Sequence, residues 1–290
     1  MSTTASSTVL AGLIGAGIQA SRTPALHERE GLAHGLRYTY QLLDLDALQL
    51  DTHALPDLLL SAERQGFNGL NITYPCKQLV LPLLDELSPQ ARCIGAVNTV
   101  VFTNGKRIGH NTDCLGFAEG FRRSLSDVAV GHVVQMGAGG AGAAVAHALL
   151  DEGVQHLQIF DVDHSRAHNL VDNLNQHFPG QRATVGTDLT TSMAQANGLV
   201  NTTPVGMAKL PGMPVPATLL HKALWVAKII YFPLQTELLR TARALGCRTL
   251  DGRQMAVFQA VSAFGLISGA TADASRMLAH FEEMNNAVQG

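Results

Sequence analysis

Two charged side chains in the first half of the sequence are candidates for proton transfer. Lys77 ends the stretch NITYPCK, where Pro75 breaks an apolar strand, and Asp113 lies in GHNTDCLGF, directly before an amphipathic stretch. Taken singly, Lys77 is a solvated surface lysine and Asp113 is a helix N-cap, because these are common roles of the two residue types. Taken together, an aspartate that orients a buried lysine amine gives a base able to take a proton from an alcohol. The sequence leaves both interpretations open.

Two hydroxyl side chains in the stretch GIQASRTP are candidates for binding a small anion. Ser21 and Thr23 lie beside the expected start of a helix, where backbone N–H groups and the helix dipole attract a carboxylate. The alternative is that both hydroxyls only cap the helix, with Thr23 as the N-cap and Pro24 in the first turn. The spacing is equally compatible with the two roles.

A glycine-rich loop in the middle of the chain is predicted to bind a dinucleotide. A similar loop at 15–20 competes with it, but only the second loop has glycine at all three positions of the Rossmann fingerprint. The second loop also runs straight into an Ala-rich helix, whose N-terminal N–H groups would face the phosphates. After the first loop the helix starts several residues late. The predicted cofactor loop consists of Gly137, Ala138, Gly139, Gly140, Ala141 and Gly142.

An acidic residue downstream of this loop indicates which dinucleotide is preferred. Asp161 ends the predicted strand LQIFD, 19 residues beyond Gly142, where a carboxylate accepts hydrogen bonds from the adenosine ribose. The same carboxylate repels the 2′-phosphate of NADP, so the sequence favours NAD. Arg166 follows closely enough that use of NADP as well stays open.

Apolar runs alternate with amphipathic stretches along the chain, which predicts an α/β fold of parallel strands covered by helices. Beyond the glycine loop, strands are expected in LQIFD, around 184–185, in GLVNTT, in WVAKIIYF and in RTL, with helices between them. We expect two domains. A substrate-binding and catalytic domain is expected at 8–116, completed by helices within 252–290, and a doubly wound, Rossmann-type NAD-binding domain is expected at 117–251.

The composition indicates a small-molecule partner. The 290 residues carry a net charge of −3, and no run of Lys or Arg exceeds two residues, so neither a nucleic acid nor a membrane surface is indicated. The four cysteines lack metal-binding spacing, and His164 and His168 lack a third ligand, so no metal is predicted. The N-terminus lacks the basic region of a signal peptide. We therefore expect a cytoplasmic protein whose residues 1–7 are a disordered lead.

A series of motifs resembles the shikimate/quinate dehydrogenase family. In chain order they are SRTPALHE, NITYPCK, GAVNTV, GHNTDCLGF, GAGGAG, NTTPVGM, YFPLQTELL and DGRQMAVFQAVSAF. The resemblance implies an enzyme that reversibly oxidises the C3 hydroxyl of shikimate or quinate, which are hydroxylated cyclohexene and cyclohexane carboxylates. It also implies that the substrate lies across a cleft from the nucleotide-binding domain.

The resemblance assigns roles to individual residues. Lys77 and Asp113 would be the catalytic pair. The substrate ligands would be Ser21 and Thr23 for the carboxylate, and Thr73, Asn98, Asp113 and Gln259 for the ring hydroxyls, with Tyr231 lining the pocket. Besides the glycine loop and Asp161, the cofactor would meet Thr202, Pro204 and Met207 near the nicotinamide ribose, and Gly252 and Met255 at the nicotinamide.

Three departures from common family patterns bear on specificity. Asp161-Val162-Asp163 replaces the Asn-Arg-Thr of many NADP-using members, which supports NAD. Ser21-Arg22-Thr23 replaces the usual Ser-x-Ser of the shikimate-specific branch and resembles the NAD-dependent quinate/shikimate branch. Lys228 stands where relatives usually carry Asp, so packing there is expected to differ.

Several questions stay open from the sequence alone. The same fold could act on aminoshikimate or another cyclitol carboxylate, or could serve as a non-catalytic, nucleotide-binding regulatory protein. Intact Lys77 and Asp113 argue against the regulatory alternative. Both a monomer and a homodimer are compatible with the sequence.

Overall fold

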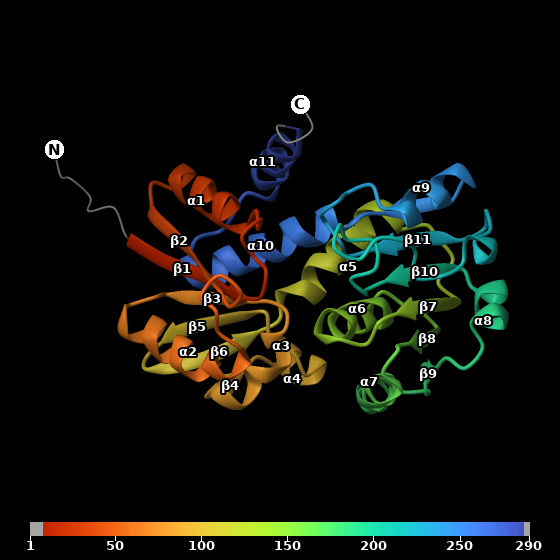
Figure 1. Ribbon diagram of the computed structural model, residues 1–290, viewed down its shortest axis with the longest axis horizontal. Helices are drawn as coiled ribbons and strands as arrows, with labels where there is room; N and C mark the ends of the chain where they lie inside the picture. Colours follow the sequence, from red (N-terminus) through yellow and green to blue (C-terminus); the bar gives the residue numbers. More distant parts are fainter. Residues whose placement is uncertain (1–7, 287–290) are drawn as a thin grey trace. The chain divides into compact units, whose positions relative to one another are not determined.

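The chain folds into two compact units, each built around its own six-stranded sheet (Figure 1). The computed structural model describes residues 8–286, so the predicted disordered lead at 1–7 lies outside the described residues. Unit 1 contains the residues up to Thr112 and those from Val257 on, and unit 2 runs from Asp113 to Ala256. The predicted α/β architecture, with C-terminal helices returning to the first unit, is confirmed. The functional boundaries at 116 and 251 stay a prediction.

Unit 1 has a mixed sheet with strand order β2-β1-β3-β5-β6-β4. Its strands are β1 (Thr8–Gly15), β2 (Arg37–Asp44), β3 (Gly69–Ile72), β4 (Glu86–Leu87), β5 (Thr99–Thr103) and β6 (Lys106–His110). Its helices are α1 (Thr23–Ala33), α2 (Leu55–Arg64), α3 (Cys76–Leu79), α4 (Pro89–Ile94), most of α10 (Gly252–Ser268), and α11 (Ala274–Asn286), with short 3₁₀ turns at Thr52–Ala54 and Leu81–Leu83.

The residues of β1 divide between two hydrophobic clusters, one on each face of the unit 1 sheet. Val9, Ala11 and Leu13 pack with residues of α10, and Ile14 packs with residues of α2. This division follows from the strand geometry, in which successive side chains point to opposite faces. Because both faces of β1 are buried, its sequence reads as a continuous apolar run.

Unit 2 has an all-parallel sheet with strand order β12-β11-β10-β7-β8-β9. Its strands are β7 (His132–Met136), β8 (His156–Phe160), β9 (Ala183–Val185), β10 (Gly198–Asn201), β11 (Trp225–Lys228) and β12 (Arg248–Leu250). Its helices are α5 (Thr112–Leu125), α6 (Gly140–Asp151), α7 (His164–His177), α8 (Leu189–Gln195) and α9 (Glu237–Ala244), with a 3₁₀ turn at Ala217–Leu219. The helices α5 and α10 each contain one of the two unit boundaries.

Two predicted strands are shorter in the structure than the apolar runs that suggested them. The run WVAKIIYF forms a strand only to Lys228, because the next carbonyls turn back to the lysine amine. The run GLVNTT ends as a strand at Asn201, whose side chain donates to the carbonyl of Val205 and so closes a turn.

The predicted N-cap at Thr23 is also wrong. The helix α1 begins at Thr23 itself, and Arg22 is the N-cap residue but makes no capping hydrogen bond with its side chain, whereas the Ser21 hydroxyl accepts the N–H of Thr23 at 3.3 Å. Pro24 lies in the first turn, as predicted. The two hydroxyls of Ser21 and Thr23 instead contact each other at 3.1 Å.

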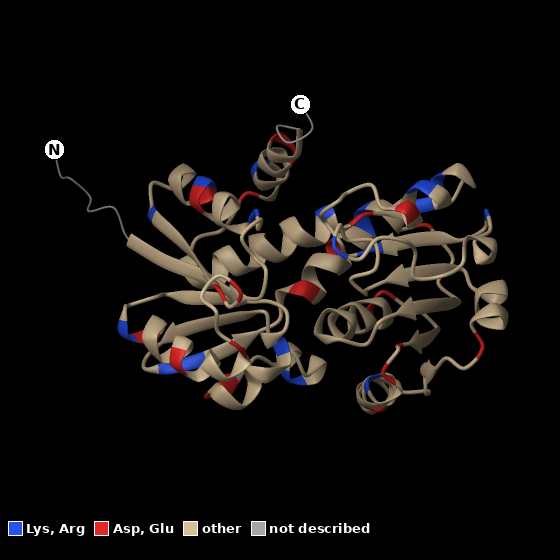
Figure 2. Cartoon of the chain, viewed as in Figure 1, with Lys and Arg blue, Asp and Glu red and all other residues tan. Residues whose placement is uncertain are grey.

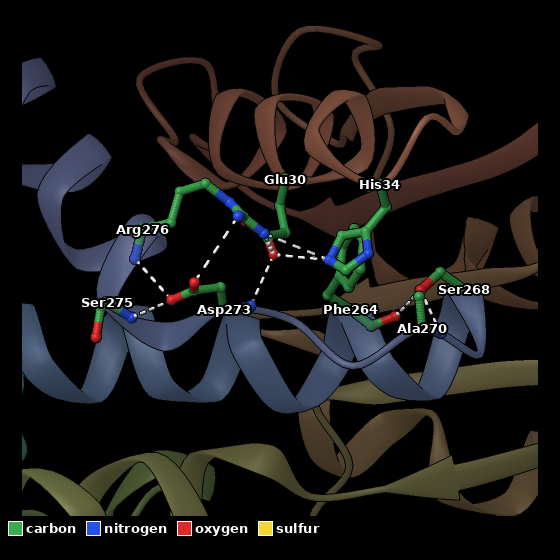
Figure 3. Close-up of polar contacts among 8 residues, drawn as sticks. All are labelled: Glu30, His34, Phe264, Ser268, Ala270, Asp273, Ser275 and Arg276. Carbon is green, nitrogen blue, oxygen red and sulfur yellow. Dashed lines mark hydrogen bonds and ion pairs between the residues drawn. The ribbon is translucent and has the colours of Figure 1, made fainter.

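Glu30 fastens α11 to α1 within unit 1, as Figure 3 shows. Its side chain is 1% exposed and accepts hydrogen bonds from Arg276 at 2.6 and 2.8 Å and from the backbone N–H of Asp273 at 2.7 Å. His34, one turn further along α1, lies 3.1 Å from the same carboxylate. The C-terminal helix is therefore held on α1 by charge-assisted hydrogen bonds.

Charged residues of both signs are interspersed over the helices and loops, and the strands are largely uncharged (Figure 2). Within residues 8–286 no helix is long and apolar enough to cross a membrane. The same residues contain no group of three or more His, Cys, Asp or Glu side chains that could hold a metal ion.

Candidate active site

The topology of unit 1 brings the predicted substrate ligands to one edge of its sheet. The strands β1 and β3 are parallel, so the segments that follow Gly15 and Ile72 leave the sheet at the same edge. The strand β5 is antiparallel to β3, which places Asn98, the residue before β5, at that edge as well. Since β6 is antiparallel to β5, its following residue Asn111 and then Thr112 also lie there.

The loop after β1 leads to Ser21 and Thr23, and two of its backbone N–H groups already have a hydrogen-bond acceptor within the protein. The carboxylate of Asp44, at the end of β2, accepts hydrogen bonds from the backbone N–H groups of Gly17 at 2.9 Å and Ile18 at 3.1 Å. Burial acts to raise the pKa of Asp44, but hydrogen bonds from the Gln19 side chain and from the backbone N–H groups of Gly17, Asp46 and Ile18 outweigh it and hold the pKa below its ordinary value. A protein carboxylate thus occupies the anion position of the first glycine-rich loop, which supports the choice of the second loop for the cofactor.

The stretch NITYPCK lies directly against this loop. A Cβ atom on Gly15 would lie 2.3 Å from Cγ2 of Thr73, so only glycine allows the end of β1 to approach Thr73 so closely. Lys77 lies in the short helix α3, and its carbonyl accepts the backbone N–H of Val97 at 2.9 Å. The chain therefore places Lys77 beside the segment that carries Asn98.

Asn98 joins the start of β5 to the start of α5. It is 3% exposed, and its Oδ1 accepts the backbone N–H of Thr112 at 2.7 Å while its Nδ2 donates to the Thr112 hydroxyl at 2.9 Å. The Thr112 hydroxyl lies 3.5 Å from Oε1 of Gln259 in α10. Thus Asn98 and Gln259, two predicted ligands of the ring hydroxyls, meet through a threonine that the sequence analysis did not single out.

Asp113 is the second residue of α5 and the first residue of unit 2. Its side chain is 5% exposed. A position in the first turn of a helix suits a negative charge because of the helix dipole. Asp113 is therefore not a helix N-cap outside α5 but lies inside its first turn.

In unit 2 the predicted cofactor residues follow the carboxyl ends of the parallel strands. The strand β7 has β8 on one side and β10 on the other, so the strand order reverses at β7. The predicted helix directly follows the glycine loop, and in the structure α6 starts slightly earlier, at Gly140 inside the loop, with Gly139 as its N-cap residue. The first N–H groups of a helix lack intrahelical partners and point toward any bound phosphate.

The shape of the glycine loop fits a pyrophosphate. A Cβ atom on Gly142 would lie 2.5 Å from the carbonyl oxygen of Gly137, so α6 packs against the loop only without a side chain there. A Cβ atom on Gly139 would meet no atom within 4 Å, which leaves open space directly over the helix N-terminus. Close packing at one glycine and open space at another are two of the three requirements of the dinucleotide fingerprint, the third being the glycine of the tight turn.

Asp161 follows β8 and has structural partners as well as its predicted ribose role. Its carboxylate accepts the backbone N–H of Ala138 at 2.6 Å and that of Asp163 at 2.8 Å. It thereby ties the glycine loop to the end of β8. Arg166 lies 3.3 Å from the carboxylate of Asp163, so its guanidinium is paired with the negative charge of the N-cap residue of α7.

Thr202 also holds the glycine loop. Its hydroxyl lies 2.8 Å from the carbonyl oxygen of Met136 and 2.9 Å from that of Gly137, and a Cβ atom on Gly137 would come within 2.7 Å of it. Pro204 and Met207 form the following turn, in which the N–H of Met207 donates to the carbonyl of Pro204 at 3.0 Å and Met207 is exposed.

The remaining predicted cofactor and substrate residues lie at the ends of β11 and β12. Gly252 begins α10 and packs against the loop that carries Tyr231, since a Cβ atom on it would lie 2.5 Å from the carbonyl oxygen of Ile230. Met255, one turn later, is buried. Tyr231 is partly buried.

Sequence reasoning missed Gln135, a fully buried amide that is the penultimate residue of β7. Its Nε2 donates to the carbonyls of Gly137 at 2.8 Å and Gly142 at 3.0 Å. These two hydrogen bonds link the first and the last glycine of the loop through one buried side chain. The signal was present, because a glutamine interrupts the apolar run HVVQM just before the glycines. A lone polar residue in a buried strand requires a hydrogen-bond partner.

The parallel sheet, the glycine loop at the reversal of strand order and the acidic residue after β8 define a dinucleotide-binding protein of the Rossmann type. The chain is 55% identical over 277 residues to the shikimate dehydrogenase (NADP(+)) of Streptomyces avermitilis, covering 95% of each chain. It is 50% identical over 273 residues to the quinate/shikimate dehydrogenase (NAD(+)) of Corynebacterium glutamicum, covering 93% of this chain and 96% of that one. The chain therefore belongs to the shikimate dehydrogenase family and is an NAD(P)-dependent oxidoreductase.

Two further comparisons agree with this assignment. The family model described as the shikimate dehydrogenase substrate binding domain matches residues 13–100, within unit 1. The quinate dehydrogenase from Corynebacterium glutamicum in complex with NAD has a similar structure, with a TM-score of 0.88, 47% identity, and coverage of 96% of this chain and 99% of that one. The predicted family and enzyme class are confirmed. The names of these relatives divide between NAD and NADP, so they leave the preferred cofactor open.

Proposed function

We propose that this protein reversibly oxidises the C3 hydroxyl of quinate, shikimate or both, with NAD as its preferred cofactor and with Lys77 and Asp113 handling the proton. The observation that carries the proposal is the assembly at one edge of the unit 1 sheet. There the backbone and side-chain contacts described above bring Lys77, Thr73 and Asn98 to the same edge as the two hydroxyls at the start of α1.

The substrate carboxylate is proposed to bind Ser21 and Thr23. Their hydroxyls lie 3.1 Å apart at the start of α1, where a hydroxyl pair and a helix N-terminus both favour a negative charge. The ring hydroxyls are proposed to bind Thr73, Asn98 and Gln259. Arg22 is directed elsewhere, because its guanidinium donates to the carbonyl of Met284 at 2.7 Å.

The proton of the C3 hydroxyl is proposed to pass to the amine of Lys77, with the carboxylate of Asp113 orienting that amine. A bound nicotinamide supplies the acceptor for the hydride that leaves C3, so the substrate loses one hydride and one proton and a ketone forms. In the reverse direction Lys77 returns the proton to the carbonyl oxygen. The chain's own residues would then need to supply only a proton carrier, which is the role proposed for Lys77.

The preference for NAD is supported by charge at the end of β8. Asp161 places a carboxylate where the adenosine ribose would bind, and Asp163 adds a second one two residues later. The nearby Arg166 is paired with Asp163, which reduces its availability to a 2′-phosphate.

The direct test is NADH formation from quinate or shikimate by the purified protein and by Lys77→Ala and Asp113→Asn variants. We expect kcat to fall by at least about a hundredfold in each variant, since general acid-base catalysis contributes factors of roughly this size or more. Lys222→Ala, at an exposed position in unit 2, is the matched control and should retain full activity. Full activity of Lys77→Ala would rule out Lys77 as the proton carrier. Turnover of an amino-substituted analogue, with no turnover of quinate or shikimate, would identify a different substrate.

A further inference from the structure

Lys228 is a buried lysine at the carboxyl end of β11, outside the residues assigned so far. Its side chain is 1% exposed, and its Nζ donates to the carbonyl oxygens of Ile230 at 2.6 Å and Pro233 at 3.0 Å. The two acceptors flank Tyr231 and Phe232. A single ammonium group thus joins both ends of the loop that follows β11.

The ammonium group of Lys228 has no ion pair among the described residues. The acidic group that faces it, Asp251 after β12, instead accepts hydrogen bonds from Arg253 at 3.0 and 3.2 Å. The basic group that faces it, Arg243 on α9, donates to Gln235 at 2.6 Å. Burial lowers the pKa of Lys228 to about 8, Asp251 acts against this shift and Arg243 adds to it.

A buried charge without an ion pair is costly, because its lost hydration must be replaced by hydrogen bonds. An apolar side chain at the end of a buried strand would avoid this cost. The carbonyls of Ile230 and Pro233 supply the hydrogen bonds that replace the lost hydration of the ammonium group. The position of the loop and the charge of the lysine therefore depend on each other.

The loop held by Lys228 contacts the residues proposed to border the nicotinamide. Its Ile229 and Ile230 carbonyl oxygens lie 2.3 and 2.5 Å from the position of a Cβ atom on Gly252. On another side, Cδ1 of Ile230 lies 3.5 Å from a Cβ position on Gly206, in the turn between Pro204 and Met207. Movement of Ile230 would therefore displace two segments of the proposed cofactor site.

We propose that Lys228 is a positioning residue for the dehydrogenase reaction, whose ammonium group fixes the loop at 229–233 and with it Tyr231 and the start of α10. The proposal rests on the function proposed above. A protonated lysine makes two charge-assisted hydrogen bonds here, whereas the neutral amine makes weaker ones. Loss of the proton loosens the loop, so turnover declines as the pH rises through the pKa of this group.

The kinetic test compares the pH profiles of the wild-type enzyme and the Lys228→Met variant, which keeps an unbranched side chain and removes both donors. We expect kcat to fall by about tenfold or more at neutral pH, the effect of losing a charge-assisted hydrogen bond. An ionisation near 8 on the alkaline side of the wild-type profile should be absent from the variant. Leu239→Ala, a buried change on α9, controls for general destabilisation and should keep the wild-type profile.

Two further measurements make the outcome decisive. Lys228→Gln keeps a neutral donor and should give intermediate turnover without the alkaline ionisation, which covers the case in which Lys228→Met fails to fold. Hydrogen exchange of 229–235 in the free protein, corrected for intrinsic rates, should accelerate in the variants and in the wild type at alkaline pH. This readout needs no substrate, so it separates failure of the Lys228 proposal from failure of the proposed function. Unchanged exchange and superimposable pH profiles would overturn the proposal.

Discussion

The side-chain oxygen of Asn98 accepts the backbone N–H of Thr112 at 2.7 Å, directly before Asp113 in the chain. A residue assigned to the substrate also fixes the start of α5. Its amide is largely used by this contact and by the Thr112 and Thr99 hydroxyls. Asn98 therefore orients residues proposed to surround the substrate, in addition to any contact that it makes with a ring hydroxyl.

Asn98→Ala is expected to reduce both stability and catalysis. The substitution leaves the buried N–H of Thr112 without its acceptor, which costs about 1–3 kcal/mol of unfolding free energy. Urea unfolding measures this loss, and kcat/KM should fall at the same time because Asp113 follows the released residue. Asn169→Ala, at an exposed position on α7, should change neither quantity. A normal unfolding free energy in Asn98→Ala would show that Asn98 does not anchor α5.

Two substitutions at Asp161 separate its structural role from its role in cofactor choice. Asp161→Asn keeps a carbonyl oxygen for the N–H of Ala138 but removes the charge. We expect it to shift the ratio of kcat/KM values toward NADP by about ten- to a hundredfold, equivalent to roughly 1.5–3 kcal/mol for a charged contact. Asp161→Ala also frees the glycine loop, so both cofactors should bind more weakly, NAD most of all. A cofactor ratio that is unchanged in Asp161→Asn would remove the charge argument.

Alanine at either of two glycines of the proposed cofactor loop should weaken cofactor binding, but only one of the two substitutions should also destabilise the fold. Gly142→Ala places a methyl group 2.5 Å from the carbonyl oxygen of Gly137, so we expect a lower melting temperature as well as weak cofactor binding. Gly139→Ala meets no protein atom within 4 Å, so the free protein should keep its melting temperature. Calorimetric titration should nevertheless show weaker NAD binding to Gly139→Ala, because the methyl group fills the space over the helix N-terminus. Wild-type affinity there would place the pyrophosphate elsewhere.

The carboxylate of Glu30 is expected to make stability depend on pH. Burial acts to raise the pKa of Glu30, but hydrogen bonds from Arg276, Asp273 and His34 outweigh it and hold the pKa below its ordinary value. A group whose pKa is lower in the folded state stabilises the protein above its unfolded-state pKa. This stabilisation is lost as the pH falls through the lower, folded-state value.

Glu30→Gln tests this linkage. At neutral pH we expect a loss of about 1–2 kcal/mol, because the hydrogen bonds are charge-assisted but Arg276 stays partly exposed. The difference from the wild type should shrink in acid, as followed by denaturant unfolding at several pH values. Glu283→Gln, which removes an exposed ion pair with Arg29, should have little effect. Equal losses in the two variants would contradict a special role for Glu30.

The sequence was sufficient to predict elements with a strong local pattern. The strand before the glycine loop, the immediate start of α6 and the acidic residue after β8 follow from apolar runs, glycine spacing and one charge. The length of β11 was not predictable in this way. An apolar run continues past Lys228, but the lysine amine, held in a buried position, draws the following carbonyls away from the sheet.

Contacts between distant segments were the part of the site that sequence could not show. Asp44 and Gln135 were not selected, because their partners are backbone groups of loops whose shape is unknown before the fold is formed. Thr112 belongs to the motif GHNTDCLGF, but the sequence assigned it no role of its own. Only the pairing of β3, β5 and β6 places it between Asn98 and Gln259.

The hydrogen bond from Arg22 to the carbonyl of Met284 links the carboxyl-terminal helix to the residue between Ser21 and Thr23. A substitution in the last turn of α11 therefore acts within reach of the proposed carboxylate site, although Arg22 and Met284 are 262 residues apart in the chain. In directed evolution of substrate preference, residues in the last turns of α11 should be varied together with the residues proposed to bind the substrate.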